Sequence, residues 1–233
     1  MIGLETWINN FTQFSRVPLS PEALADIPHP YVEYAIFGAF KAAELASIIG
    51  GCIVHPIYRF YLRRQLTPET TTNNSFKIIR NRCRRIQGRF LLGGLFFGPV
   101  AAFSYLKWKG LTEREVKDRC YKIRCDHENM VLDRVCVAFG LVGWYWKRFQ
   151  GAVDGINIGV AYALFNNKVL EKYTYPMLRD KIGESERFDT VEEAEAKRNL
   201  IQQLIAKKAD QIRATQENEL WSSGKLAAKD RIE

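Results

Sequence analysis

Two ionisable side chains inside an apolar stretch are the residues whose chemistry stands out in this sequence. Lys41 and Glu44 both lie within the largely apolar run 31–54. A charged side chain in a segment of this kind is costly to bury, so it normally has a partner or marks a functional path. The two residues are three positions apart, which places them on one face of a helix. We therefore expect Lys41 and Glu44 to form an ion pair.

Asp154 is the third intramembrane polar candidate. It lies near the start of a second apolar run, 151–170. A carboxylate near the end of a membrane helix usually has a specific partner. We expect Arg134 or Arg89 to be that partner, in a structural ion pair rather than a proton relay.

Catalytic and cofactor chemistry has little support in the sequence. The glycine-containing stretches GLFFGP and GAVDGINIG lack both the strand context and the Lys-Ser/Thr of phosphate-binding loops. Cys120, Cys125 and His127 match no common zinc spacing. Five cysteines without a paired CxxC argue against a disulfide framework. We expect no catalytic residue, cofactor, metal or small-molecule substrate, and hence no enzyme.

The net charge of +8 is concentrated in the segment 59–89, which holds nine Lys/Arg residues against one acid, Glu69. Such a cluster beside a membrane segment is typical of a contact with anionic phospholipid, cardiolipin included, or of a loop that is not translocated. The segment has one aromatic residue after its first turn, Phe76, and no nucleic-acid reading motif, so we expect no nucleic-acid partner. The lipid-binding candidates are Arg59, Arg63, Arg64, Arg82, Arg84, Arg85 and Arg89.

Four apolar runs of membrane length must position these residues. They cover 31–54, 88–106, 130–146 and 151–170, each close to the roughly 20 residues that span a bilayer as a helix. A mean hydropathy of −0.22 would not by itself indicate a membrane protein, because the charge lies between and after the runs. The pattern predicts an all-α fold, a bundle of four transmembrane helices. A soluble basic helical adaptor is the alternative.

Small residues repeat every fourth position in these runs, and twelve of the sixteen glycines lie there. Residues four apart share one face of a helix, so each row predicts a flat groove that another backbone can approach closely. The helix-packing candidates are Gly38, Ala42, Ala46, Gly50, Gly94, Gly98, Ala102, Gly140, Gly151, Gly155, Gly159 and Ala163. Only four residues separate the third run from Gly151, which predicts a tight antiparallel hairpin.

The pattern divides the chain into three parts: an amphipathic and extended N-terminal segment, 1–30, the transmembrane domain, 31–170, with its basic loop 59–89, and a soluble helical tail, 171–233. Residues 2–15 have the apolar spacing of an amphipathic helix, for a membrane or a packing surface.

Three further segments have readable patterns. Four prolines predict an extended lead-in over 17–30. Alternating charges over 107–130 predict a solvated helix, with a capping box formed by Thr112 and Glu115. A long polar helix is predicted over 190–218, with a narrow apolar stripe suited to docking on another protein: Leu200, Ile201, Leu204, Ile205 and Ile212.

The four glycine-rich runs resemble the Tim translocase superfamily of mitochondrial inner-membrane proteins, which includes an accessory subunit of respiratory complex I. The resemblance covers about residues 31–170 and rests on GGLFFG at 93–98, on the Gly151/Gly155/Gly159 row and on the basic first loop. The family's Arg-x3-Asp signature has no counterpart, since Arg148 and Asp154 are six apart.

The resemblance implies a multi-pass protein of the mitochondrial inner membrane. The two ends of the chain, 2–15 and 190–218, have the patterns of helices that dock on other proteins. They favour a non-catalytic accessory subunit that holds neighbouring membrane subunits and lipid in a respiratory chain assembly, complex I or a supercomplex containing it. A component of an inner-membrane protein-import translocase is the alternative. The charge distribution around the first run places both termini on the intermembrane-space side.

Overall fold

The computed structural model describes residues 4–12, 20–67, 71–174, 182, 184–205, 207–209 and 211. No strand occurs among these residues, and most of them are helical, so the predicted all-α class is confirmed. The chain divides into two compact units, Met1–Arg187 and Phe188–Glu233.

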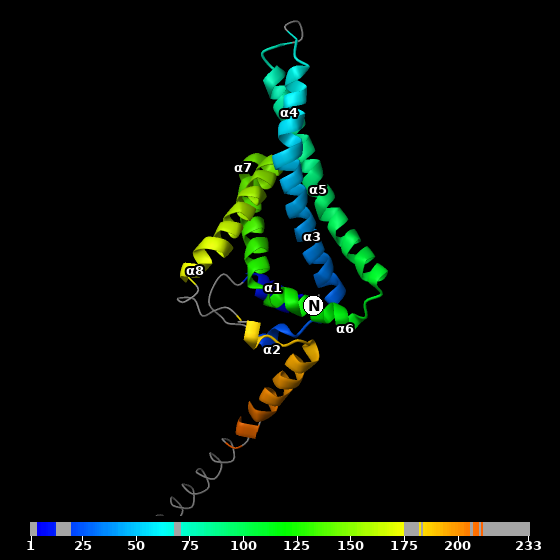
Figure 1. The fold of residues 1–233 in the computed structure, drawn as a ribbon, viewed down its shortest axis with the longest axis vertical. Helices are drawn as coiled ribbons and strands as arrows, with labels where there is room; N and C mark the ends of the chain where they lie inside the picture. The colour runs from blue at the N-terminus through cyan, green and yellow to red at the C-terminus, as the bar shows by residue number, and fades with distance from the viewer. Residues whose placement is uncertain are drawn as a thin grey trace, which may run out of the picture. The chain divides into compact units, whose positions relative to one another are not determined.

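The first unit is built around two long antiparallel helices (Figure 1). The first begins as α3 (Pro30–Ile48), continues through a π-helical stretch, η1 (Ile49–Val54), and ends as α4 (His55–Arg64). The second is α5 (Ser75–Lys109), which passes through Pro99 without ending. It stops at Gly110, whose left-handed φ of 61° suits a residue without a Cβ. Among the described residues, these two 35-residue helices are the ones long and apolar enough to cross a membrane.

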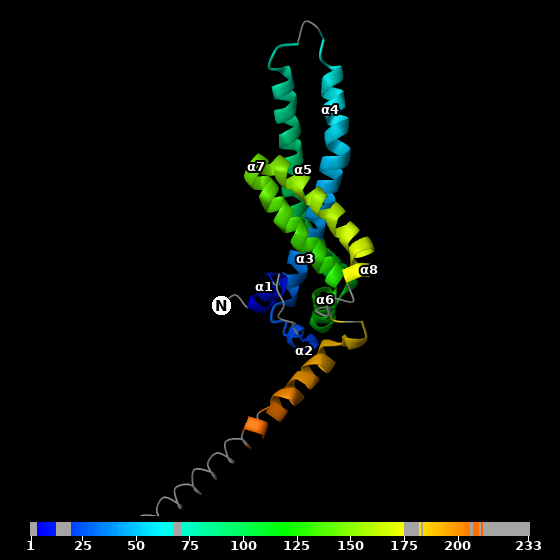
Figure 2. The same cartoon turned by 90° about the vertical axis from the view of Figure 1, so that its left-hand side faces the viewer.

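The third and fourth apolar runs both lie in α7 (His127–Phe165), which is broken in the middle. Lys147 and Arg148 leave the helical conformation, and Arg148 has a positive φ of 56°. The chain reverses at this point, so the two halves of α7 pack against each other (Figure 2). The predicted antiparallel hairpin is therefore confirmed. Beyond α7 follow η2 (Asn166–Leu170), α8 (Glu171–Thr174) and η3 (Glu184–Glu186).

Three short elements gather at the end of the first unit where α3 begins: α1 (Glu5–Thr12), α2 (Pro21–Leu24) and α6 (Glu113–Cys125) (Figure 1). The predicted capping box is present in α6. However, α6 is not fully solvated, because one face is buried through residues that include Val116, Tyr121 and Arg124. The prediction of an extended lead-in is wrong at α2, where Ser20 caps a helical turn with proline at its first position.

The basic segment 59–89 is mostly helix rather than loop. Its residues 59–64 end α4 and 75–89 begin α5, so α4 and α5 form a hairpin that extends past α7 (Figure 2). Leu62 of α4 packs against Ile79 and Cys83 of α5 and closes the hairpin. The arginines therefore lie on a helical framework.

The second unit contains a helix over residues 191–205. Within it, four residues of the predicted apolar stripe are exposed: Leu200, Ile201, Leu204 and Ile205. Ile212 and the rest of the predicted helix to residue 218 lie outside the described residues. Docking of this stripe on another protein remains a prediction.

Candidate functional site

Small residues bring the backbones of α3 and α5 into direct contact. A Cβ on Gly98 would collide with the carbonyl oxygen of Gly38 and with the Cα of Ala39. A Cβ on Gly94 would lie 2.7 Å from the carbonyl oxygen of Ala42. Only glycine allows backbones to approach this closely, which is how small-residue rows drive helix association in membranes. The two rows predicted on these helices therefore pack on each other.

The remaining residues of the predicted rows are also used inside the chain. Gly50 of η1 packs on Phe90, where a Cβ would lie 2.8 Å from the Phe90 Cβ. In the α7 hairpin, each glycine of the row meets the opposite half: Gly140 against Ile156, Gly151 against Gly143, Gly155 against Phe139 and Gly159 against Cys136, while Ala163 is fully buried. The row in α7 therefore closes the hairpin, and a partner helix cannot reach it.

An open groove runs along the seam between α3 and α5. Its volume is about 620 Å³ and its walls are almost entirely apolar. Gly93 lies in its wall with no atom within 4 Å of the place where a side chain would begin. The remaining lining comes from both helices: Tyr34, Phe37, Gly38, Ala42, Leu45, Ala46, Ile49, Arg89, Phe90, Gly94, Phe97, Gly98, Ala101 and Ala102. The missing side chain of Gly93 keeps this groove open.

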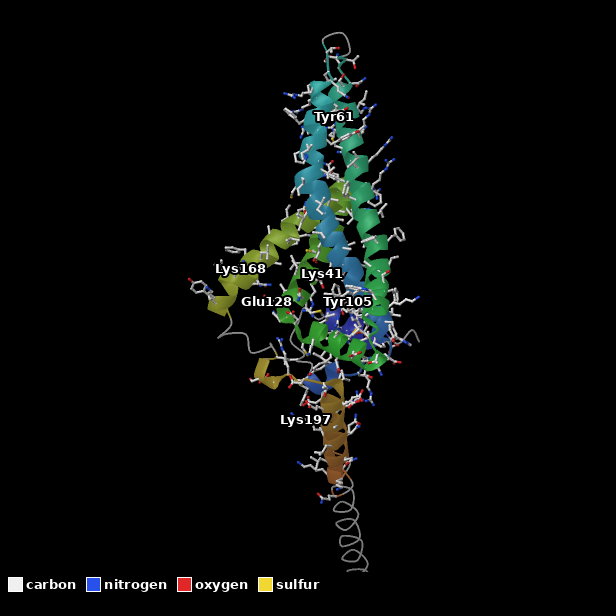
Figure 3. All side chains as sticks on the ribbon, turned by 45° about the vertical axis from the view of Figure 1, so that its right-hand side comes forward. Lys41, Tyr61, Tyr105, Glu128, Lys168 and Lys197 are labelled. Carbon is white, nitrogen blue, oxygen red and sulfur yellow. The ribbon has the colours of Figure 1, made fainter. Side chains whose placement is uncertain are left out.

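Lys41 connects α3 to α7 through two carboxyl groups. Its Nζ lies 3.3 Å from Glu44 Oε2, which confirms the predicted pair, and 2.6 Å from Asp133 Oδ1. The position of Lys41 midway along α3 is visible in Figure 3. Sequence reasoning missed Asp133 as the second partner. The available signal was its position inside an apolar run, the same criterion that selected Asp154.

A cavity of about 400 Å³ lies between α3, α5 and α7, beside this cluster. Glu44 and Asp133 form its polar edge. The rest of its lining is mainly aliphatic and aromatic, including Leu91, Trp144 and Phe149. The carboxyl groups of Glu44 and Asp133 therefore lie at the edge of an apolar cavity.

A second buried charge pair joins α6 to the start of α3. Arg124 donates through Nε to Glu33 Oε2 at 2.9 Å and through its Nη2 to the other carboxylate oxygen. Its Nη1 donates to the backbone carbonyls of Leu24 and Asp26 at 3.0 and 2.9 Å. Arg124 and Glu33 are only 4% and 3% exposed. This bidentate pair fastens the N-terminal segment to the helices, and no sequence prediction identified it.

The predicted partners of Asp154 are wrong. Among the described residues, the basic side chains that act electrostatically on its carboxylate are Lys147 and His55, and neither arginine is one of them. Arg134 instead donates to a backbone carbonyl in α1, and Arg89 lies along the groove on α5. The break after residue 146 turns Lys147 toward the start of the second half of α7, a reversal that helical spacing could not anticipate.

The amphipathic N-terminal helix packs its aromatic face on α3. Trp7 and Phe11 stack with ring centroids 5.1 Å apart, and both stack on Phe40 at 6.2 and 5.4 Å. Of the two surfaces considered for this helix, the structure shows packing against its own chain.

All seven arginines predicted to bind lipid are exposed, on α4 and on the first half of α5. Arg84 Nε donates to Gln150 Oε1 at 2.7 Å, which ties α5 to the α7 turn. Arg64 lies 5.0 Å from the centre of the Phe60 ring. Among the described residues, no group of three His, Cys, Asp or Glu side chains is placed to hold a metal ion.

The cysteines in α6 are expected to resist alkylation in the folded protein. Cys120 and Cys125 are buried, and desolvation raises the pKa of both thiols, that of Cys120 to about 12. The thiolate is the reactive form, so at neutral pH neither thiol reacts until the protein unfolds. Mass spectrometry after iodoacetamide treatment, with and without denaturant, measures this. Modification of Cys120 without denaturant at the rate of a free thiol would contradict the buried position of α6.

A family model described as "Protein of unknown function (DUF1757)" matches residues 7–166, more than half of the chain. The match includes all of the helices that form the groove, the cavity and both charge clusters. No curated protein matches the chain.

Proposed function

The chain belongs to the DUF1757 family. From the arrangement of its helices, we propose that it is a non-catalytic accessory membrane subunit that holds neighbouring transmembrane helices and lipid. The observation that carries this proposal is the open groove beside the α3–α5 seam. Grooves floored by small residues let a second helix or an acyl chain approach closely, which is the main source of helix association in lipid.

The outward surface of α5 supports a position in a membrane. Phe96, Phe97, Val100 and Trp108 are between 60% and 79% exposed. A row of large apolar side chains exposed on one helix is rare in soluble monomers and marks a partner or lipid surface. The aromatic end at Trp108 is followed at once by Lys109, a combination typical of membrane interfaces.

A four-helix unit in the membrane requires the two halves of α7 as well. The first half, residues 127–146, is about 30 Å long at 1.5 Å per residue, which equals the hydrocarbon thickness of a bilayer. The second half continues through η2 to residue 170. Trp144, Tyr145 and Trp146 lie at the turn between them, and Tyr145 and Trp146 are 78% exposed, as residues of an interfacial aromatic belt would be.

For the assembly, the proposal is a respiratory chain complex of the mitochondrial inner membrane, complex I or a supercomplex containing it. The resemblance of the glycine-rich runs to the Tim superfamily supports this location. The burial of Glu44 and Asp133, the two partners of Lys41, supports a holding role over a translocase role, because a path for precursor proteins needs polar groups that face water. Anionic phospholipid, cardiolipin included, is the proposed ligand of the basic hairpin.

Substitution of Gly93 by leucine tests the groove. The new side chain has free space, so the fold is retained, but it fills the groove from one wall. We expect at least a tenfold loss of the assembled complex on blue-native gels, with an unchanged level of the protein in the membrane.

Ser104→Leu is the matched control, because Ser104 is exposed on the same helix and does not line the groove. Normal assembly of Gly93→Leu would contradict the groove as the binding surface. Co-migration with a precursor-import complex instead of in-gel dehydrogenase activity would favour the translocase alternative. Release of the wild-type protein by alkaline carbonate would contradict a membrane role and favour the soluble adaptor.

A further inference from the structure

The cluster of Lys41, Glu44 and Asp133 contains one more acid than base. Among the described residues, Lys41 carries the positive charge that acts on Glu44, and both carboxyl groups contact its ammonium. Glu44 is 7% exposed and Asp133 3% exposed. With both carboxyls ionised, the cluster would hold an uncompensated negative charge in the interior of the helix bundle. Burial of an unpaired charge is among the largest penalties in a folded protein.

One atom of the cluster shows how this charge is compensated. Glu44 Oε1 is buried and has no hydrogen-bond partner, although the Glu44 and Asp133 carboxyl groups both contact the ammonium of Lys41. Two ionised carboxylates repel each other, whereas a carboxyl group and a carboxylate share a strong hydrogen bond. Glu44 Oε1 exposes less than 1 Å² to a water-sized molecule, which is too little for an external cation to bind this atom. A proton is the one ligand that fits.

We propose that Lys41, Glu44 and Asp133 form a proton-binding site, in which a single proton is shared between the two carboxyl groups. The O–H bond lies on Glu44 Oε1, which donates a hydrogen bond to Asp133. Asp133 is the ionised member, because its Oδ1 takes the shorter contact from Lys41, 2.6 Å against 3.3 Å for Glu44. The protonated cluster is neutral, as its position in the bundle requires.

Arg124 of α6 lines a small cavity with Asp133, but it is already paired with Glu33, so among the described residues Lys41 is the cation that contacts the two carboxyl groups. From α7, the thiol of Cys136 is the other titratable neighbour of Glu44, and its Sγ lies 3.8 Å from the carbonyl oxygen of Ile156 as a donor. From α5, the cavity wall beside the cluster contributes Leu91 and Leu95. From α1, the nearest contribution to this part of α3 is the aromatic stack on Phe40. The proton therefore replaces a missing positive charge.

Proton binding couples directly to the contact between α3 and α7. Glu44 and Lys41 belong to α3 and Asp133 belongs to α7, so the shared proton is part of the link between the helices. Loss of the proton at alkaline pH would place two negative charges against each other across this contact. Proton release would therefore weaken the packing that surrounds the cavity.

Infrared spectroscopy of the full-length protein in an ester-free detergent tests the site without any partner protein. At neutral pH, exposed carboxyl groups are ionised, so a protonated carboxyl group gives a separate carbonyl band that shifts in D2O. We expect this band in the wild type and its loss in Glu44→Gln, whose side chain has the shape of the protonated acid and keeps the hydrogen bond to Asp133. The control is Glu115→Gln, an exposed residue of the α6 capping box, which should leave the band unchanged.

A wild-type spectrum without the band at neutral pH would overturn the proposal, as would a band that persists in Glu44→Gln. The pH dependence of the free energy of unfolding is a second test, independent of the infrared band. An unfolded glutamate, with a pKa of about 4.3, has lost its proton at neutral pH, so a folded state that retains one more proton loses stability as pH rises. One extra proton changes the unfolding equilibrium constant by up to about tenfold per pH unit. We expect that dependence to flatten in Glu44→Gln, and an equally steep dependence in both proteins would overturn the site.

Discussion

Gly98→Leu is expected to separate α3 from α5 and to destroy the folded bundle. A Cβ at this position would already overlap the backbone of Gly38 and Ala39, and leucine adds three more carbons. Inserting extra atoms in a packed interior typically costs about 1–3 kcal/mol. The cost here is at the upper end or beyond it, because the clash is with backbone atoms, which cannot change rotamer.

The measurement is thermal unfolding of the purified protein, followed by circular dichroism and by protease resistance of α5. Gly93→Leu, five positions earlier on the same helix, is the matched control, because free space surrounds Gly93. A contrast between the two variants excludes a general effect of leucine on the helix. Equal stability of Gly98→Leu and wild type would show that the α3–α5 seam is not packed as described.

Arg124→Met is expected to have the second large effect. It leaves the Glu33 carboxylate buried without its partner, and it removes the donor to two backbone carbonyls. Breaking a buried ion pair by removing one partner costs about 3–5 kcal/mol. The N-terminal segment should come away from α6 first, because three of its groups bind this one guanidinium: Thr6 Oγ1 and the carbonyls of Leu24 and Asp26.

Limited proteolysis at the N-terminal segment and chemical denaturation measure this loss. Lys122→Met, an exposed residue of the same helix, should have almost no effect. The double variant Arg124→Met/Glu33→Met should recover part of the stability, because it leaves no uncompensated charge. If the double variant is as unstable as the sum of the single ones, the pair is not the dominant contact at this position.

Local sequence patterns predicted the helices well because the relevant signals are local. The capping box at Thr112 and the pairing of Lys41 with Glu44 each involve residues within a few positions of each other. The small-residue rows likewise indicate a close contact, since only small side chains permit one. The sequence did not indicate which small-residue row packs against which other row. That choice depends on the turn at Arg148, which closes the α7 row on its own hairpin.

The charge clusters depend on contacts between distant parts of the chain. Asp133 is 92 positions from Lys41, and Arg124 is 91 positions from Glu33. For each of these residues, the sequence offers several oppositely charged residues as possible ion-pair partners. Helical spacing does not show which of them is the partner when they lie on different helices. For Asp154, the same ambiguity produced the wrong partners. The α3–α5 groove was equally hidden, because it depends on the relative rotation of two helices whose groove-lining residues are 40 or more positions apart in the chain.

In the proposed membrane position, the length of the two principal helices determines the height of the basic hairpin above the bilayer. A helix of 35 residues is about 52 Å long, whereas the hydrocarbon core is about 30 Å thick. About 20 Å of each helix must therefore stand outside the core, as a stiff arm. Charges at its far end, such as Arg63 and Arg64, lie beyond the screening distance of about 10 Å from the surface. The anionic lipid proposed for the hairpin would therefore contact the arginines near its base, such as Arg89, rather than those at its tip.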